Sequence, residues 1–159
     1  MRYLYKILLA IFVLTGCEKK PTPVLNNIDF YLGDSYYSIS GKAQRTRDHK
    51  TISLKISSEG SSNIALSILI NEYTDAFHYK LIKDYTLYTH DNVKFSYISS
   101  GYYESADGFL NVRSDNDKTI KGDFEFTAQN VFDSTDFITV KDGYFEIDYS
   151  ESIAIERKY

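Results

Sequence analysis

The sequence predicts an all-β fold, an antiparallel β-sandwich or flattened barrel of about nine or ten strands. Three observations predict it. From Val24 onward the chain contains no proline, short runs alternate apolar with polar residues, and clusters of polar turn residues separate these runs. No long apolar helical stripe and no internal repeat interrupts this pattern.

The expected strands follow one another along the chain, each with one apolar face that packs inward and one face toward solvent. In chain order the apolar faces are Ile28, Phe30 and Leu32; Tyr37, Ile39 and Gly41; Ile52, Leu54 and Ile56; Ile64, Leu66, Ile68 and Ile70; Val93, Phe95 and Tyr97; Ile120, Phe124, Phe126 and Ala128; Ile138 and Val140; and Phe145, Ile147 and Tyr149.

Turn residues punctuate these strands. Asp142-Gly143 predicts a type I′ hairpin turn, because both positions of that turn require positive φ. Residues 59–63 and 115–118 are typical of polar turns, and Gly122 inside a strand pattern indicates a bulge.

The pattern is least regular over residues 71–91. There, residues 77–81 fit one helical turn and residues 85–88 fit a strand.

The N-terminus predicts a cleaved export signal over residues 1–16. Arg2 and Lys6 precede an apolar run over residues 7–14. As a helix, such a run of eight residues would extend about 12 Å at about 1.5 Å per residue. A bilayer core is about 30 Å thick, so the run is too short to span it.

The run ends in Leu14-Thr15-Gly16-Cys17, which resembles the bacterial lipobox. The resemblance implies cleavage before Cys17 and acylation of its thiol, which would anchor the chain stably in a membrane. Residues 17–25 then form a polar tether with both prolines, and residues 26–159 form a single β-domain. The expected location is the bacterial cell envelope, at the outer membrane. The face of the membrane stays open, since Glu18 stands alone before two lysines.

Composition excludes several function classes. The chain has 18 Lys and Arg against 22 Asp and Glu, a net charge of −4, which argues against nucleic acid as a partner. Its single Cys excludes an internal disulfide framework and a Cys-rich zinc site. No pattern indicates a cofactor.

Three C-terminal blocks resemble a Bacteroidota lipoprotein family of unknown function. They are Gly108-Phe109-Leu110-Asn111-Val112, residues 121–128 and residues 139–147, and the opening over residues 30–37 is similar too. The match is poor over about residues 71–105. The resemblance implies a small anchored β-domain and supplies no catalytic residues.

Catalytic and metal motifs are weak. Gly33-Asp34-Ser35 is similar to the first block of the GDS-type esterases, but that chemistry needs a C-terminal His, and the last one here is His90. His49, His78 and His90 lack metal-ligand spacing.

Carboxylate motifs are equally weak. The acidic turns at residues 115–117 and 133–136 do not follow the EF-hand order. A glycosidase pair cannot be located among the carboxylates. We therefore expect a protein that is not an enzyme.

The strongest binding candidates are two adjacent tyrosine pairs, Tyr36-Tyr37 and Tyr102-Tyr103. In a strand, one member of each pair must point away from the core. An exposed Tyr can stack on a sugar or anchor a protein, although β propensity alone also places Tyr in strands. We expect an envelope module that binds a protein or a glycan. The alternatives are a small anchored hydrolase, esterase-like or glycosidase, and a lipocalin-like carrier of an apolar ligand.

Overall fold

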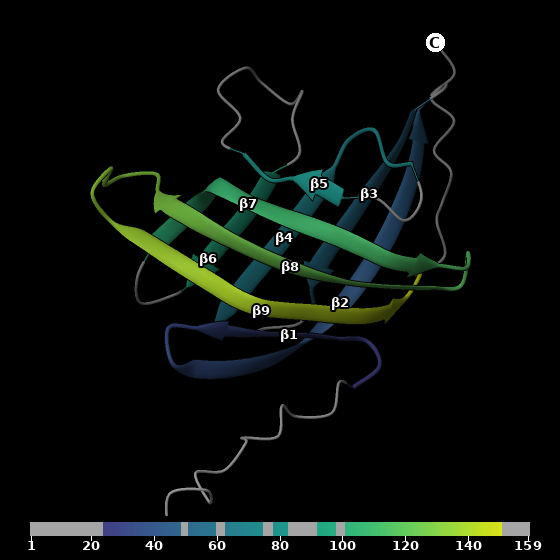
Figure 1. The fold of residues 1–159 in the computed structure, drawn as a ribbon, viewed down its shortest axis with the longest axis horizontal. Helices are drawn as coiled ribbons and strands as arrows, with labels where there is room; N and C mark the ends of the chain where they lie inside the picture. The colour runs from purple at the N-terminus through teal and green to yellow at the C-terminus, as the bar shows by residue number, and fades with distance from the viewer. Residues whose placement is uncertain are drawn as a thin grey trace, which may run out of the picture.

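The computed structural model describes residues 24–48, 51–59, 63–74, 78–82, 92–97 and 101–150, and over these residues the chain is all-β (Figure 1). The strands are β1 (Asn27–Leu32), β2 (Ser35–Asp48), β3 (Thr51–Ser58), β4 (Ile64–Ile70), β5 (His78–Lys80), β6 (Asn92–Tyr97), β7 (Gly101–Asp115), β8 (Thr119–Asn130) and β9 (Phe137–Asp148). The predicted fold class is confirmed, and no helix occurs within the described ranges.

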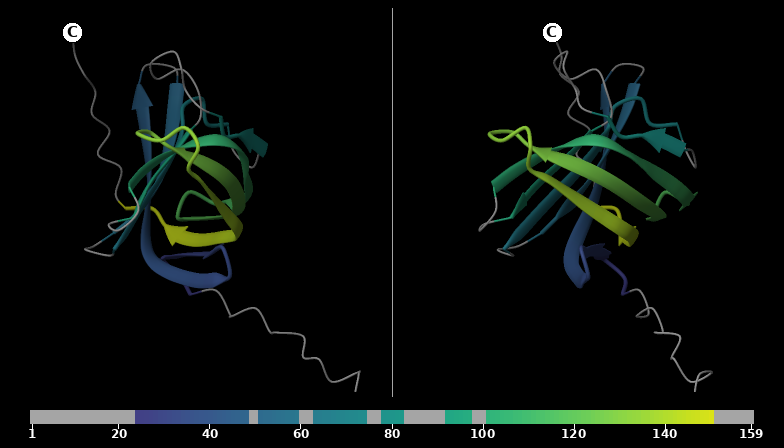
Figure 2. Two further views of the ribbon diagram at one scale, coloured as in Figure 1. Left: turned by 90° about the vertical axis from the view of Figure 1, so that its left-hand side faces the viewer. Right: turned by 60° about the vertical axis from the view of Figure 1, so that its left-hand side comes forward.

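All nine strands belong to one antiparallel sheet with the order β5-β7-β6-β4-β3-β2-β1-β9-β8, and β7 also pairs with β8. The sheet bends back on itself, so that β7, β8 and β9 lie across β6, β4, β3 and β2 (Figure 1 and Figure 2). The ladders β2–β1–β9 and β6–β7–β8 join the two layers. The result is a flattened, two-layered fold.

The core lies between these layers and follows the predicted faces. In β4 the burial pattern places every second residue inward, from Ile64 to Ile70, and β8 does the same from Ile120 to Ala128. Phe124 lies at the centre of an aromatic cluster. Its ring centroid is 6.5 Å from that of Phe30, 6.1 Å from Phe126 and 6.4 Å from Phe145. Large side chains thus fill the space between the layers.

The predicted hairpin at Asp142-Gly143 is wrong, because β9 runs through it without turning back. β9 carries one extra residue there: Phe124 and Phe126 of β8 pair with Gly143 and Val140. The site is therefore a β-bulge, and Asp142 has the positive φ, 50°, that the pattern called for. In a regular strand Val140 and Phe145 would face opposite sides, because they are an odd number of residues apart. The extra residue of the bulge lets both side chains point into the core.

The glycine in this bulge is required by packing. A Cβ on Gly143 would lie 2.5 Å from Cε2 of Phe124 and 2.6 Å from its carbonyl oxygen. Real Cβ atoms do not approach other atoms so closely, so only glycine lets β9 pass over the Phe124 ring.

Other sequence expectations have mixed outcomes. The turn after Asp115 is confirmed, with Asp117 at φ 67°. The irregularity expected at Gly122 belongs to the partner strand, because β7 carries the extra residue opposite Lys121 and Gly122. The helical turn expected at residues 77–81 is wrong over residues 78–80, which form β5 paired with Leu110 and its neighbours in β7.

Several predictions fall outside the described residues. They are the export signal, Cys17 and most of the tether, residues 60–62 of the turn after β3, residues 85–88, and His49 and His90.

Candidate functional site

The first tyrosine pair lies at the start of β2, directly after the β1–β2 turn. The Tyr36 ring is 39% exposed on the outer face, and its hydroxyl donates to Oδ1 of Asp29 at 3.0 Å. Partial burial and this hydrogen bond raise the pKa of Tyr36 above its usual value. Tyr37 faces the other way and stacks on Phe30 at 5.5 Å between centroids. Only Tyr36 of this pair therefore offers an open ring.

The second pair opens β7 and divides in the same way. Tyr103 is 2% exposed and donates to Oδ2 of Asp136 at 2.8 Å, which places it in the core. Tyr102 is 44% exposed. Of the four tyrosines named as binding candidates, the structure thus leaves Tyr36 and Tyr102 for a partner to reach.

Tyr102 lies beside the β8–β9 hairpin, which carries three more exposed apolar side chains. Val131 is 41%, Phe132 89% and Phe137 50% exposed. The backbone N–H of Val131 donates to the carbonyl of Tyr102 at 2.9 Å, and Phe137 pairs with Gln129. We call these four residues, Tyr102, Val131, Phe132 and Phe137, the apolar tip.

The hairpin that carries the apolar tip is well ordered by hydrogen bonds. Nε2 of Gln129 donates to the Ser134 carbonyl at 2.7 Å, and the Phe132 N–H donates to Oδ1 of Asn130 at 2.9 Å. Asp133 accepts from both the N–H and the hydroxyl of Thr135. These bonds hold Phe132 outward on a defined backbone.

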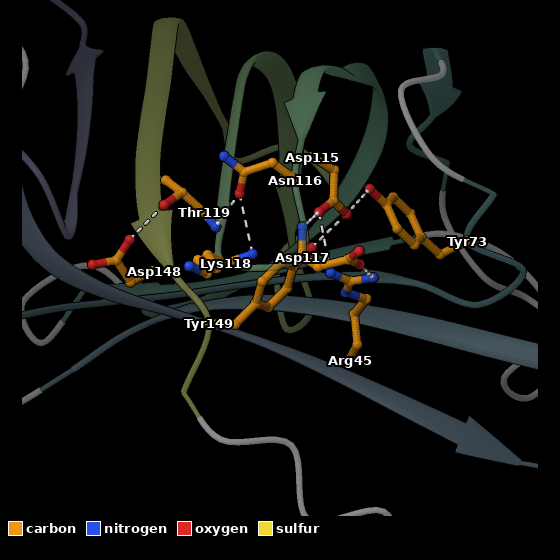
Figure 3. A network of polar contacts seen from close by, with 9 residues as sticks. All are labelled: Arg45, Tyr73, Asp115, Asn116, Asp117, Lys118, Thr119, Asp148 and Tyr149. Carbon is orange, nitrogen blue, oxygen red and sulfur yellow. Dashed lines mark hydrogen bonds and ion pairs between the residues drawn. The ribbon is translucent and has the colours of Figure 1, made fainter.

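A network of polar contacts surrounds the carboxylate of Asp115, at the end of β7 (Figure 3). Its side chain is 3% exposed. Oδ2 accepts from the hydroxyls of Tyr73 at 2.6 Å and Tyr149 at 2.7 Å. Oδ1 accepts from Nη2 of Arg45 and from the N–H of Asp117, each at 3.1 Å.

The Arg45 guanidinium completes this Asp115 cluster. Its Nη1 donates to Oδ1 of Asp117 at 2.9 Å, and its Cζ lies 4.2 Å from the centroid of the Tyr149 ring. Burial alone would raise the pKa of Asp115, but the hydroxyls of Tyr73 and Tyr149 with the Arg45 charge lower it overall. Burial, then the bond to Asp115, raises the pKa of both tyrosines.

The Asp115 cluster is suited to holding together segments that are far apart in the sequence. The carboxylate already accepts four hydrogen bonds, so it has no open position for a substrate proton. Its donors come from β2, from the segment after β4, from the β7–β8 turn and from the residue after β9.

The esterase-like motif Gly33-Asp34-Ser35 lies at the β1–β2 turn. Gly33 and Asp34 form the β1–β2 turn, and Ser35 is the first residue of β2, paired with Leu32. His78 lies on β5, where its Nδ1 bonds to Oδ1 of Asn111 at 2.5 Å. Among the described residues, no histidine hydrogen-bonds to Ser35. Within the described residues, Ser35 is therefore not paired with the base that nucleophilic catalysis requires.

Carboxylates of both acidic turns accept hydrogen bonds from other side chains of the chain. Asp117 binds Arg45, and Asp136 accepts from Tyr103 and from Nδ2 of Asn130 at 2.9 Å. Over the described ranges, no group of three or more His, Cys, Asp or Glu residues is placed to hold a metal ion.

No protein-family model, no curated protein and no solved structure matches this chain. The resemblance of the C-terminal blocks to a lipoprotein family stays a prediction. Within the described part, no helix has the length and apolar character to cross a membrane.

Most of the apolar tip was not predicted from the sequence. Residues 133–136 were expected only as a polar turn, and Val131 and Phe132 were not singled out, although two adjacent apolar residues beside such a turn are the available signal. Tyr102 was found from the adjacent pair alone.

Proposed function

We propose that this chain is an envelope lipoprotein anchored by acylated Cys17, and that its β-domain is a non-enzymatic module that binds a partner protein through the apolar tip. The observation that carries the proposal is the exposure of Phe132, 89%, on a hairpin held in place by hydrogen bonds. Exposed aromatic groups that cluster on a fixed surface are characteristic of interaction sites.

The position of the apolar tip supports this role. The N–H of Asn26 donates to the carbonyl of Glu146, so the first described residues lie beside the far end of β9. Phe137 begins that same strand, whose twelve residues span roughly 35 Å at about 3.3 Å each. A tether ending at residue 25 would thus hold the domain from one end and direct the tip away from the anchor.

The energetics favour a protein partner with an apolar pocket. Removing one Phe or Val side chain from water contributes about 1.5–3 kcal/mol. Val131, Phe132 and Phe137 together could therefore supply the central contacts of an interface, with Tyr102 at its margin.

Site-specific photocrosslinking in the native host tests the proposal. A photoreactive phenylalanine analogue at position 132 retains the shape of the side chain, so it should yield one discrete protein adduct. The same analogue at Lys118, on the β7–β8 turn, is the matched control and should yield none. Mass spectrometry of the adduct identifies the partner.

Other outcomes would contradict the proposed function. Adducts of position 132 with phospholipid alone would indicate a membrane-contacting loop. Equal adducts from positions 132 and 118 would show that the tip has no specific partner. The hydrolase alternative would require turnover of an ester or glycoside that Ser35→Ala or a carboxylate variant abolishes. The carrier alternative would require an apolar molecule that co-purifies with the chain.

A further inference from the structure

A polar groove of about 440 Å³ opens on the outer face of β2, β3 and β4, beside the start of β7. Its polar lining consists of Lys42, Lys55, Ser57, Ser58, Ser67 and Tyr102. Its two other lining residues are apolar, so the described lining includes no acidic side chain. Ligand sites commonly enclose roughly 300–1,000 Å³, and this groove falls within that range.

The register of the sheet brings the polar side chains together. Lys42 pairs directly with Ser57, and Ser57 pairs directly with Ser67. Cβ atoms of directly opposed residues lie about 4.5–5.5 Å apart, so these three form one row across the strands. Lys55 precedes Ser57 by two residues and therefore shares its face.

The groove offers polar groups with unused bonding capacity. Within the described part of the chain, the side chains of Lys55, Ser57 and Ser67 make no hydrogen bond or ion pair. Lys42 pairs with Glu59 at 3.5 Å, but both side chains are substantially exposed, and such a pair is weak. Ser57 is largely buried as a residue, but no enclosed side-chain nitrogen or oxygen of the described residues lacks a partner, so its hydroxyl remains accessible from the groove.

We infer that this groove binds an acidic saccharide, a sugar unit that carries a carboxylate or sulfate group. Lys42 and Lys55 supply the positive charge for the acidic group. The serine hydroxyls can donate to and accept from sugar hydroxyls. The exposed ring of Tyr102 supplies a flat apolar surface for the C–H face of the ring.

One observation argues against an extended peptide, and a second favours an anionic ligand. β3 and β4 have hydrogen-bonded neighbours on both sides, so they present no free edge that an extended peptide could join as a further strand. The chain carries a net charge of −4, so a groove whose described lining has two lysines and no acidic side chain differs in charge from the chain as a whole. The groove borders the apolar tip and shares Tyr102 with it, but the inference does not rest on the protein-binding role proposed for Phe132.

Isothermal titration calorimetry on the full-length chain in mild detergent tests the inference. The probes are tri-galacturonate and its fully methyl-esterified form, which differ in charge. We expect the acid to bind at least about tenfold more tightly than the ester. The affinity should also fall as the salt concentration rises, because salt screens the two exposed ammonium groups.

Matched variants locate the binding. Lys55→Gln and Tyr102→Ala should each weaken tri-galacturonate binding by about fivefold or more. Lys118→Gln removes the same charge on the β7–β8 turn and should leave the affinity unchanged. Glu59→Gln should tighten binding, because it frees Lys42 and removes a competing carboxylate. The melting temperature of each variant verifies that it remains folded.

Three results would overturn the inference. Equal affinity for the acid and the ester would remove the role of the lysines. Inorganic sulfate that binds as tightly as the saccharide, with Tyr102→Ala unaffected, would reduce the groove to a simple anion site. Failure of tri-galacturonate and of a sulfated tetrasaccharide to bind would exclude the ligand class. None of these results depends on the photocrosslinks of position 132.

Discussion

Asp115 illustrates how one residue can join distant parts of this chain. Its partner Arg45 is 70 residues away in sequence, Tyr73 is 42 and Tyr149 is 34 residues away. The carboxylate is nearly inaccessible to water and is compensated by hydroxyls, an amide and a guanidinium. Removing its charge would leave Arg45 without its inner partner and the tyrosine hydroxyls with a weaker acceptor.

Asp115→Asn should therefore destabilise the domain. We expect a loss of about 2–4 kcal/mol in the free energy of unfolding at pH 7, measured by urea denaturation. Asp34→Asn in the exposed β1–β2 turn is the control and should change the free energy by less than about 0.5 kcal/mol. Equal effects of the two substitutions would contradict the structural role of the Asp115 cluster.

The same cluster predicts how stability depends on pH. The pKa of Asp115 in the folded state is lowered from its ordinary value of 3.8, so the unfolded chain binds its proton more readily. The contribution of the Asp115 carboxylate to the free energy of unfolding is complete above about pH 5. It is lost as pH falls through 3.8 toward the pKa of the folded state. The difference in the free energy of unfolding between the natural chain and Asp115→Asn should therefore decrease as pH falls from about 5 through 3.8. A difference that stays constant down to about pH 3 would refute the assignment.

Among the elements, β9 shows what local patterns can and cannot distinguish. The Asp142-Gly143 pair and the shift of apolar phase around it predict a break in the strand. A hairpin turn and a bulge both satisfy that local signal, since each accommodates a positive φ. Pairing decides between them: β1 and β8 both continue past the bulge, so β9 is held on both sides and cannot turn back.

Gly143→Ala tests this account of the bulge. The new Cβ would collide with the Phe124 ring and with a backbone carbonyl, so we expect a loss of roughly 1–3 kcal/mol in stability. Gly33→Asn provides the comparison, because Gly33 has φ 60° and a Cβ added there would meet no atom within 4 Å. Thermal unfolding should show a clear decrease for the first variant and little change for the second. The reverse order would favour a turn at 142–143.

At the scale of the whole molecule, the proposed anchor and the apolar tip define an axis. The first described residues lie beside the end of β9, and the tip lies at its beginning. The groove lies on the outer face of β2, β3 and β4, away from the core. A domain held in this way would present the proposed protein-binding tip at one end and the proposed saccharide-binding groove beside it, with Tyr102 at the border between them.

Cys17→Ser tests the anchor. Without the thiol no diacylglyceryl group can be attached, so the chain should move from the membrane fraction to the soluble fraction. Ser35→Ala leaves the lipobox intact and should remain with the membranes. Mass spectrometry of the natural chain should find an acylated Cys17 as the first residue. A free thiol at Cys17 with residues 1–16 still attached would exclude lipidation.

The sequence alone determined the fold class and the inward face of most strands. The alternation of apolar and polar residues is a local property, and it correctly places Ile64, Leu66, Phe124 and Phe126 in the core. The same rule separates the members of the two tyrosine pairs, since neighbours in a strand face opposite sides. The alternation rule cannot tell which of two adjacent tyrosines points into the core, because the two residues are identical.

Only the tertiary structure decided what meets across the sheet. Register and the bending of the layers bring Asp115 to Arg45, align Lys42 with Ser57 and place Tyr102 beside Val131. These contacts join residues that share no local pattern, because strand pairing depends on the whole set of neighbours. The apolar tip and the groove arise from that pairing, and so does the distinction between a bulge and a turn in β9.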